Sequence, residues 1–221
     1  MSDLSAKELF EKGIEYFNAK ELPLAEKYFE KALKLEPERI SILENLALVY
    51  FSNEKFENSE NILNKIIKLE KDSPRVFNLM LKALKKQDKI KELKLYLDKE
   101  LNQKNLHPKY KILEKFLYPL FFDNKNEIDL ARQKFENSID ELDKIKDLKL
   151  KIDSDLVEPP IFNISYDPFD NLNINKKIVN LYRKFYPELN KSFIIKKKNK
   201  KIRIGFLSEY FTNKKIGKLY K

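Results

Sequence analysis

The sequence contains no cysteine, only three glycines and a single histidine among its 221 residues. Without cysteine the chain can form neither a disulfide bond nor a thiolate site, which fits a reducing compartment. No apolar run approaches the ~18 residues that a membrane span needs, and the start, MSDLSAKELF, has no apolar signal-peptide region. These absences argue against a secreted disulfide scaffold and against a membrane partner, and they favour a cytoplasmic protein.

The single histidine, His107, precedes Pro108 in the loop-like stretch NLHPKY. No acidic residue or cysteine stands beside it in the sequence, and no metal-ligand spacing occurs elsewhere in the chain. We therefore expect His107 to be a surface residue rather than a metal ligand or a catalytic base. We also expect the chain to bind no metal.

Lysine and arginine outnumber acidic residues, 45 against 35, which gives a net charge of +10. Such a charge could favour a polyanionic partner. Most lysines, however, are spread among acidic residues, and the one dense basic run, Lys196 to Arg203, leads into a predicted strand. We interpret this run as a solvated linker, so nucleic acid is an unlikely partner. With 42% hydrophobic residues the chain is long and apolar enough to fold around a real core.

Small and large residues recur in the first part of the chain at the offsets of a tetratricopeptide repeat (TPR), a 34-residue helix–turn–helix unit. The matching residues are Leu9, Gly13, Tyr16, Ala25, Phe29, Ala32 and Pro37. Gly13 and Ala25 are small enough for the two helices to approach closely, and Phe29 fills the groove between them. Pro37 ends the second helix. The spacing therefore predicts a closely packed helical hairpin.

The ends of these helices carry matching signals, and the pattern returns further along the chain. Ser5 followed by Glu8 predicts a capping box on the first helix, and Pro23 suits the first turn of the second. The second copy is Leu43, Leu46, Ala47, Tyr50, Ser59, Leu63 and Ile66. A degenerate third copy begins near Pro74. The sequence thus predicts a mainly α fold, a TPR-type α-solenoid with repeats at 5–38, 39–72 and 73–104.

Stacked helix pairs of this kind form a concave surface lined by the first helix of each pair, which suits an extended peptide or a partner helix. Asn45 and Asn78 lie on two of these first helices and are the candidate peptide-binding residues. An amide can pair with a peptide backbone whatever the peptide's side chains. The alternative is that both are polar residues on a solvated helix face. A protein or peptide in the groove is the predicted partner.

The middle of the chain is helical in pattern but no longer repeats. Residues 105–150 keep apolar residues at helical spacing and are interpreted as a helical joint, in which Pro119 suggests a kink or an early helix end. Residues 151–200 begin with an arm that contains VEPPIFNISYDPFDNLN, whose prolines and aromatic rings predict an extended segment lying on other structure. An amphipathic helix, Ile174 to Phe185, follows and leads to the basic linker.

The chain changes character again at KIRIGFLSEYFTNKKIGKLYK, residues 201–221, where a β-branched run meets Gly205 and predicts a strand. This stretch is one of four that carry a resemblance. The others are the repeats, the joint KFLYPLFFDNKNEIDLARQKFENSIDEL and the segment NLYRKFYPELN. Together they resemble the amino-terminal part of Spindly-like, tetratricopeptide-bearing O-linked N-acetylglucosamine transferases.

The resemblance implies that KIRIGFLS is the first strand of a two-lobed, Rossmann-like catalytic region, which transfers a sugar from UDP-N-acetylglucosamine to protein serine or threonine. A parallel strand needs neighbours on both edges, so we expect residues 201–221 to be the truncated start of that region. Lys214 stands where the family has an active-site histidine, and a lysine is a poor acid–base group at neutral pH. The fragment itself is therefore expected to have no catalytic residue, no cofactor and no transferase activity.

Two functions follow from these patterns. In the first, the chain is the amino-terminal part of a glycosyltransferase of this kind, and its repeats present protein substrates. In the second, it is a free-standing TPR adaptor that binds a protein or peptide and performs no chemistry.

Overall fold

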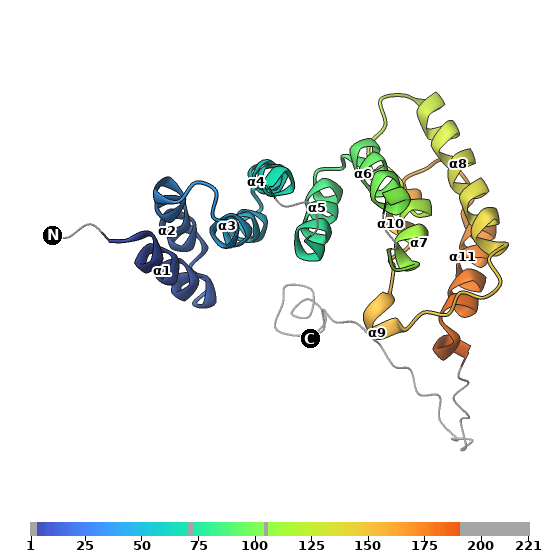
Figure 1. The fold of residues 1–221 in the computed structure, drawn as a ribbon. Helices are drawn as coiled ribbons and strands as arrows, with labels where there is room; N and C mark the ends of the chain where they lie inside the picture. Colours follow the sequence, from blue (N-terminus) through green and yellow to red (C-terminus); the bar gives the residue numbers. More distant parts are fainter. Residues whose placement is uncertain (1–3, 70–72, 104–105, 191–221) are drawn as a thin grey trace, which may run out of the picture. The chain divides into compact units, whose positions relative to one another are not determined.

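The computed structural model describes residues 4–69, 73–103 and 106–190, and within these ranges every regular element is a helix (Figure 1). The first six are α1 (Ala6–Asn18), α2 (Leu22–Leu35), α3 (Ile40–Ser52), α4 (Phe56–Leu69), α5 (Pro74–Lys86) and α6 (Ile90–Gln103). The others are α7 (Lys109–Lys115), α8 (Lys125–Asp143), α9 (Ile152–Asp155), α10 (Ile161–Ile164), α11 (Leu172–Phe185) and the 3-10 helix η1 (Pro187–Asn190). The predicted strand at 202–204 and Lys214 lie outside the described residues.

The helices α1 and α2 pack as the small residues predict. A methyl group built on Gly13 would lie only 2.5 Å from Cε1 of Phe29, so the helices meet at a distance that only glycine allows. Ala25 and Phe29 are fully buried opposite it. The predicted capping box is present, because the Ser5 hydroxyl accepts from the Glu8 amide while the Glu8 carboxylate accepts from the Ser5 amide. The close approach of α1 and α2 is therefore confirmed.

The turn inside each helical hairpin is repeated with a period of 34 residues. Lys20, Glu54 and Asp88 all have positive φ angles, of 62°, 60° and 53°. Each is followed by a residue whose amide donates back to the first helix: Glu21 to Tyr16 O at 2.9 Å, Lys55 to Tyr50 O at 2.8 Å and Lys89 to Leu84 O at 3.0 Å. A residue in the left-handed conformation, followed by an amide that bonds back to the helix, ends that helix in a defined direction. The three hairpins therefore share one turn geometry. The pair α5–α6 is thus a third copy, although its sequence pattern is degenerate.

A polar contact between neighbouring hairpins repeats with the same period. The carboxylate of Glu26, on α2, accepts hydrogen bonds from the turn that follows α3, and the carboxylate of Glu60, on α4, does so from the turn that follows α5. The donors are Asn53 and Lys55 to Glu26, at 3.0 and 2.5 Å, and Gln87 and Lys89 to Glu60, at 2.8 and 2.7 Å. Both carboxylates are mostly shielded from solvent, which strengthens these charge-assisted bonds.

The two small residues that let α1 and α2 approach closely are replaced by larger residues in the later hairpins. Ala47 and Ser59 take the places of Gly13 and Ala25 in the second hairpin, and the buried Ser59 hydroxyl donates to Ala47 O at 2.8 Å. In the third hairpin Leu81 and Leu93 take these places. The contact between α5 and α6 is accordingly less extensive than in the first two pairs.

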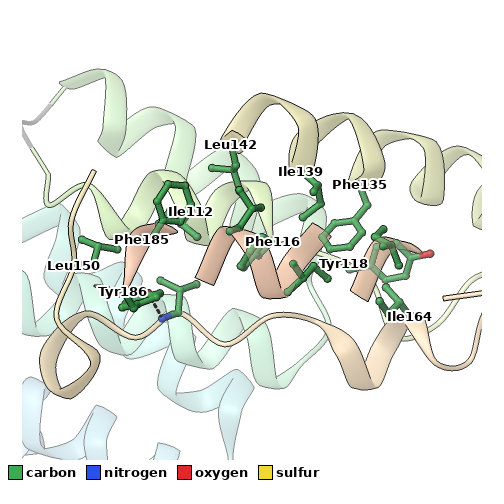
Figure 2. Packing of buried hydrophobic residues seen from close by; sticks show 14 residues of the cluster. Ile112, Phe116, Tyr118, Phe135, Ile139, Leu142, Leu150, Ile164, Phe185 and Tyr186 are labelled. Atoms are coloured by element: carbon green, nitrogen blue, oxygen red, sulfur yellow. Dashed lines mark hydrogen bonds between the residues drawn. The ribbon is translucent and has the colours of Figure 1, made fainter. Parts of the chain in front are cut away.

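A second core forms where the sequence predicts a helical joint and an arm. Residues of α7, α8 and α11 make most of it, and Figure 2 shows their side chains pointing toward one another. The labelled members are Ile112, Phe116, Tyr118, Phe135, Ile139, Leu142, Leu150, Ile164, Phe185 and Tyr186. The helix α7 ends at Lys115, before Pro119, and α8 begins after Asn124, whose side chain accepts from the Glu127 amide at 3.1 Å. The early helix end and the amphipathic α11 are as predicted.

The arm differs from its prediction in two respects. It contains two short helical turns, α9 and α10, where an extended segment is predicted. Its aromatic rings are also not all buried: Phe162 is 66% exposed and Tyr166 69% exposed, and the two rings pack edge to face on the surface. The arm is instead fixed by apolar Val157 and Ile164, and by Asp167, which accepts from the Tyr118 hydroxyl and lies 3.8 Å from the Arg132 guanidinium.

Candidate peptide-binding groove

The helix α5 exposes a polar face that includes the amide Asn78 and the lysines Lys82 and Lys85. These residues stand at i, i+4 and i+7, so they lie on one side of the helix. The opposite side, with Phe77, Met80 and Leu84 among others, is buried in the solenoid core. Because α5 is the first helix of the third hairpin, its exposed face belongs to the surface that TPR-type solenoids use for binding.

A segment of the arm lies against this face. We call residues 155–163 the strap. The Tyr186 hydroxyl donates to Asp155 O at 3.0 Å and accepts from the Val157 amide at 3.1 Å, while the Tyr182 hydroxyl donates to Val157 O. Burial raises the pKa of both tyrosines, so both hydroxyls keep their protons at neutral pH. Tyr182 of α11 and Tyr186, which directly follows α11, therefore hold the backbone of the strap at Val157, and Figure 2 shows the hydrogen bond at Tyr186.

Further contacts hold the chain at the two ends of the strap. The Lys109 ammonium donates to Ser154 O at 3.1 Å, just before the strap, and the Asn163 amide donates to Tyr118 O at 2.8 Å near its end. Between them, the Glu158 carboxylate lies 4.0 Å from the Lys85 ammonium. The strap is thus anchored at both ends.

Two adjoining hollows separate the strap from α5 and α7, with volumes of about 300 Å³ and about 690 Å³. We call them together the strap groove. Leu113 and the lysines Lys82 and Lys85 line both hollows. The exposed rings of Phe121 and Phe162 line the larger one. The groove therefore combines an apolar floor, a basic wall and aromatic residues.

Positive charge dominates the strap groove. Lys82, Lys85 and Lys86 all line the larger hollow, and the acidic residues that line it are Asp88 and Glu158. The Asp88 carboxylate is already occupied, because it accepts from the backbone amides of Leu120 at 3.1 Å and Phe121 at 3.3 Å. The wall formed by the end of α5 is consequently basic.

The two asparagines that the sequence singles out occupy different environments. Asn78 lines the smaller hollow; its side-chain oxygen accepts from the Tyr110 hydroxyl at 2.7 Å and its amide donates to Pro74 O at 2.7 Å. Asn45 is half-buried and donates to Ser41 O at 2.7 Å. The 34-residue period relates Asn45 to Leu79 rather than to Asn78. The two amides are therefore not equivalent rungs of one ladder.

His107 is exposed, as predicted, but an acidic residue from a much later part of the chain lies near it. Its Nε2 atom lies 3.8 Å from an oxygen of Asp155, at the start of the strap. A hydrogen bond from the Lys151 backbone and the nearby His107 lower the pKa of Asp155.

Among the described residues, no cluster of histidine and acidic side chains could hold a metal ion. In the same part of the chain, no helix has the length and hydropathy to cross a membrane.

Sequence reasoning missed both the strap and the basic wall. The wall could have been found by carrying the repeat register into the degenerate third copy, which places Lys82 and Lys85 on the exposed side of its first helix. The strap could not, because its contacts with α5 and α11 join segments that are far apart in the sequence and have no periodic signal.

Comparison with known proteins agrees with the helical repeats. The tetratricopeptide repeat family matches residues 16–83. Similar solved structures include the first TPR of Spaghetti (RPAP3) bound to HSP90 peptide SRMEEVD, 20% identical, which covers 60% of this chain and 92% of that chain with a TM-score of 0.42. The TPR2B-domain:pHsp70 complex of yeast Sti1 is 18% identical and covers 62% and 97%, with a TM-score of 0.40. PilF of Pseudomonas aeruginosa is 20% identical and covers 63% and 60%, with a TM-score of 0.41. No curated protein matches the sequence.

Proposed function

We propose that this chain is a protein-interaction module that holds an extended peptide segment of a partner protein in the strap groove. The observation that carries the proposal is the groove itself, about 690 Å³ in its larger part, between α5, α7 and the strap. Hollows of this size that join an apolar floor to a few placed polar groups are typical of binding sites. The TPR-type solenoid that forms one wall supports the same function, since such solenoids bind through their first helices.

Within this site Asn78 is the amide best placed to contact a bound peptide. It lines the smaller hollow, and the Tyr110 hydroxyl holds its side-chain oxygen. Asn45 is proposed to contact a peptide only where that peptide extends along α3. Replacing Asn78 with alanine should therefore weaken binding more than replacing Asn45.

A random peptide library displayed on phage tests the proposal. Selected peptides are measured by calorimetry and then cross-linked through a photoreactive amino acid placed at position 82, in the groove. Position 134 on α8, also an exposed lysine, is the matched control. We expect cross-links from position 82 and none from position 134. Selection of no binding peptide, or cross-linking from position 134 alone, would refute the proposed function.

A second candidate function rests on the sequence KIRIGFLSEYFTN, whose resemblance favours a glycosyltransferase. We propose that in this case the groove presents protein substrates to a catalytic region that uses UDP-N-acetylglucosamine as sugar donor. Residues 1–221 alone are expected to give no transfer to protein serine or threonine. Radiolabelled sugar transfer by this chain would contradict that expectation, whereas further βα units in a longer reading frame would support the glycosyltransferase.

A further inference from the structure

Resting on the proposed function, we propose that the strap groove selects an acidic peptide segment with an aromatic side chain, and that Glu158 of the strap competes with the peptide's carboxylates for the same lysines. The ligand class follows from the charge and the apolar surface of the groove. The competition follows from the position of Glu158.

Lysine ammonium groups of the basic wall are available to bind a ligand carboxylate. No ion pair joins Lys82 or Lys86 to another residue within the described ranges, and both side chains are exposed at the larger hollow. Lys85 has one carboxylate neighbour, Glu158, at 4.0 Å. Asp88 keeps its negative charge but is held by backbone amides, so an incoming carboxylate meets three ammonium groups and two carboxylates, of which Glu158 is the exposed one. Charge complementarity thus favours an acidic ligand.

Glu158 marks where that carboxylate would sit. The backbone next to Glu158 is held in place, because Val157 is buried and its backbone is hydrogen-bonded to two tyrosine hydroxyls. The Glu158 side chain itself is 81% exposed. An ion pair this exposed is weak, so an incoming carboxylate can replace it. The strap therefore supplies an internal competitor that lowers the affinity for any acidic ligand.

The aromatic requirement comes from two exposed rings that line the hollow. Phe121 is 76% exposed and Phe162 is 66% exposed, which leaves large apolar faces uncovered in the free protein. Leu117 and Leu113 line the hollow beside them. A bound aromatic side chain would cover this surface, and ring pairs add stabilisation beyond the area that they bury.

Lysines beside aromatic rings are also a feature of single-stranded nucleic acid sites. The geometry favours a peptide, because Lys82 to Lys86 spans only about 6 Å of helix. That length matches about one phosphate and cannot follow a nucleic acid backbone. The apolar floor with Leu113 and Leu117 suits a side chain rather than a phosphate.

The test measures fluorescence anisotropy with a labelled synthetic peptide in which Glu and Asp flank a Phe. Its first control has Gln and Asn in place of the acids, its second has Ala in place of the Phe, and an oligothymidine strand is the third probe. We expect the acidic aromatic peptide to bind at least about tenfold more tightly than each control probe. Its affinity should fall when salt rises from about 50 to 200 mM. Tighter binding of oligothymidine, or equal binding of the amide peptide, would overturn the proposal.

Variants of exposed side chains assign the effect to the groove without disturbing the fold. Lys82→Gln and Lys86→Gln should each weaken the acidic peptide about three- to fivefold, whereas Lys134→Gln on α8 should leave it unchanged. Glu158→Gln should tighten binding about two- to fivefold, by removing the competitor. Unchanged or weaker binding by the Glu158 variant would reject the competition. If library peptides cross-link at position 82 but carry no acids, this inference fails while the proposed function stands.

Discussion

Replacing Gly13 with alanine tests whether the first hairpin is held together by close helix packing. The added methyl carbon would lie 2.5, 2.6 and 2.9 Å from three carbons of the Phe29 ring. Real Cβ atoms essentially never come closer than 3.0 Å to such a neighbour, so the ring or the helices must move. Phe29 is fully buried and packs against Phe10 at 5.6 Å between ring centroids, which leaves the ring little room to turn.

Two opposing effects set the size of the change. Alanine is a better helix former than glycine by about 1 kcal/mol, and Gly13 does not need a positive φ angle, so the backbone itself would gain from the substitution. Overpacking a well-packed core costs about 1–3 kcal/mol. Because the contact would be 2.5 Å against a buried ring, we place the overpacking cost at this site near the upper end of that range. We expect Gly13→Ala to destabilise the first hairpin by about 1–2 kcal/mol.

Amide hydrogen exchange is the suitable assay, because a solenoid can lose one hairpin without unfolding completely. Protection of α1 and α2 should fall in Gly13→Ala, while protection of α8 and α11 should not change. The double variant Gly13→Ala/Phe29→Leu should recover part of the loss, because leucine removes ring atoms at the contact. If Gly13→Ala protects α1 and α2 as well as or better than glycine, helix propensity dominates and the close-packing argument is wrong.

Two further predictions concern buried polar groups. Arg132→Leu should lower the free energy of unfolding by about 3–5 kcal/mol in urea titrations, because it leaves the Asp167 carboxylate, 2% exposed, without its cation; a loss below about 1 kcal/mol would contradict this. Burial raises the pKa of Tyr50, Tyr118 and Tyr182 above the usual value near 10, so the folded state keeps protons that the unfolded state releases. Their stabilisation is complete below about pH 10 and is lost as the pH rises further, which should lower the melting temperature between about pH 10 and 11. In Tyr182→Phe that alkaline drop should shrink; an undiminished drop would show that this tyrosine does not contribute.

The repeats could be predicted because their determinants are local and periodic. Gly13 with Phe29, the capping box at Ser5 and the apolar stripe of α11 each encode a contact or a helix end within a few turns of chain. The strap could not be predicted, because Val157 is fixed by Tyr182 and Tyr186, which are 25 and 29 residues away in the sequence. The exposure of Phe162 was also unforeseeable, since aromatic composition predicts burial on average and not at one ring.

The degenerate third repeat contributes two large apolar residues to the smaller hollow of the strap groove. In the first hairpin Gly13 and Ala25 bring the helices so close that no space remains between them. In the third, Leu81 and Leu93 occupy those positions and both line the smaller hollow. Bulky residues at a position built for small ones keep α5 and α6 from closing on each other, in line with their less extensive contact. The third hairpin thus departs from the repeat pattern at the point where α7 and the strap pack near it: Leu81 and Leu93 stay buried, while the exposed side of α5 supplies Lys82 and Lys85 to the groove.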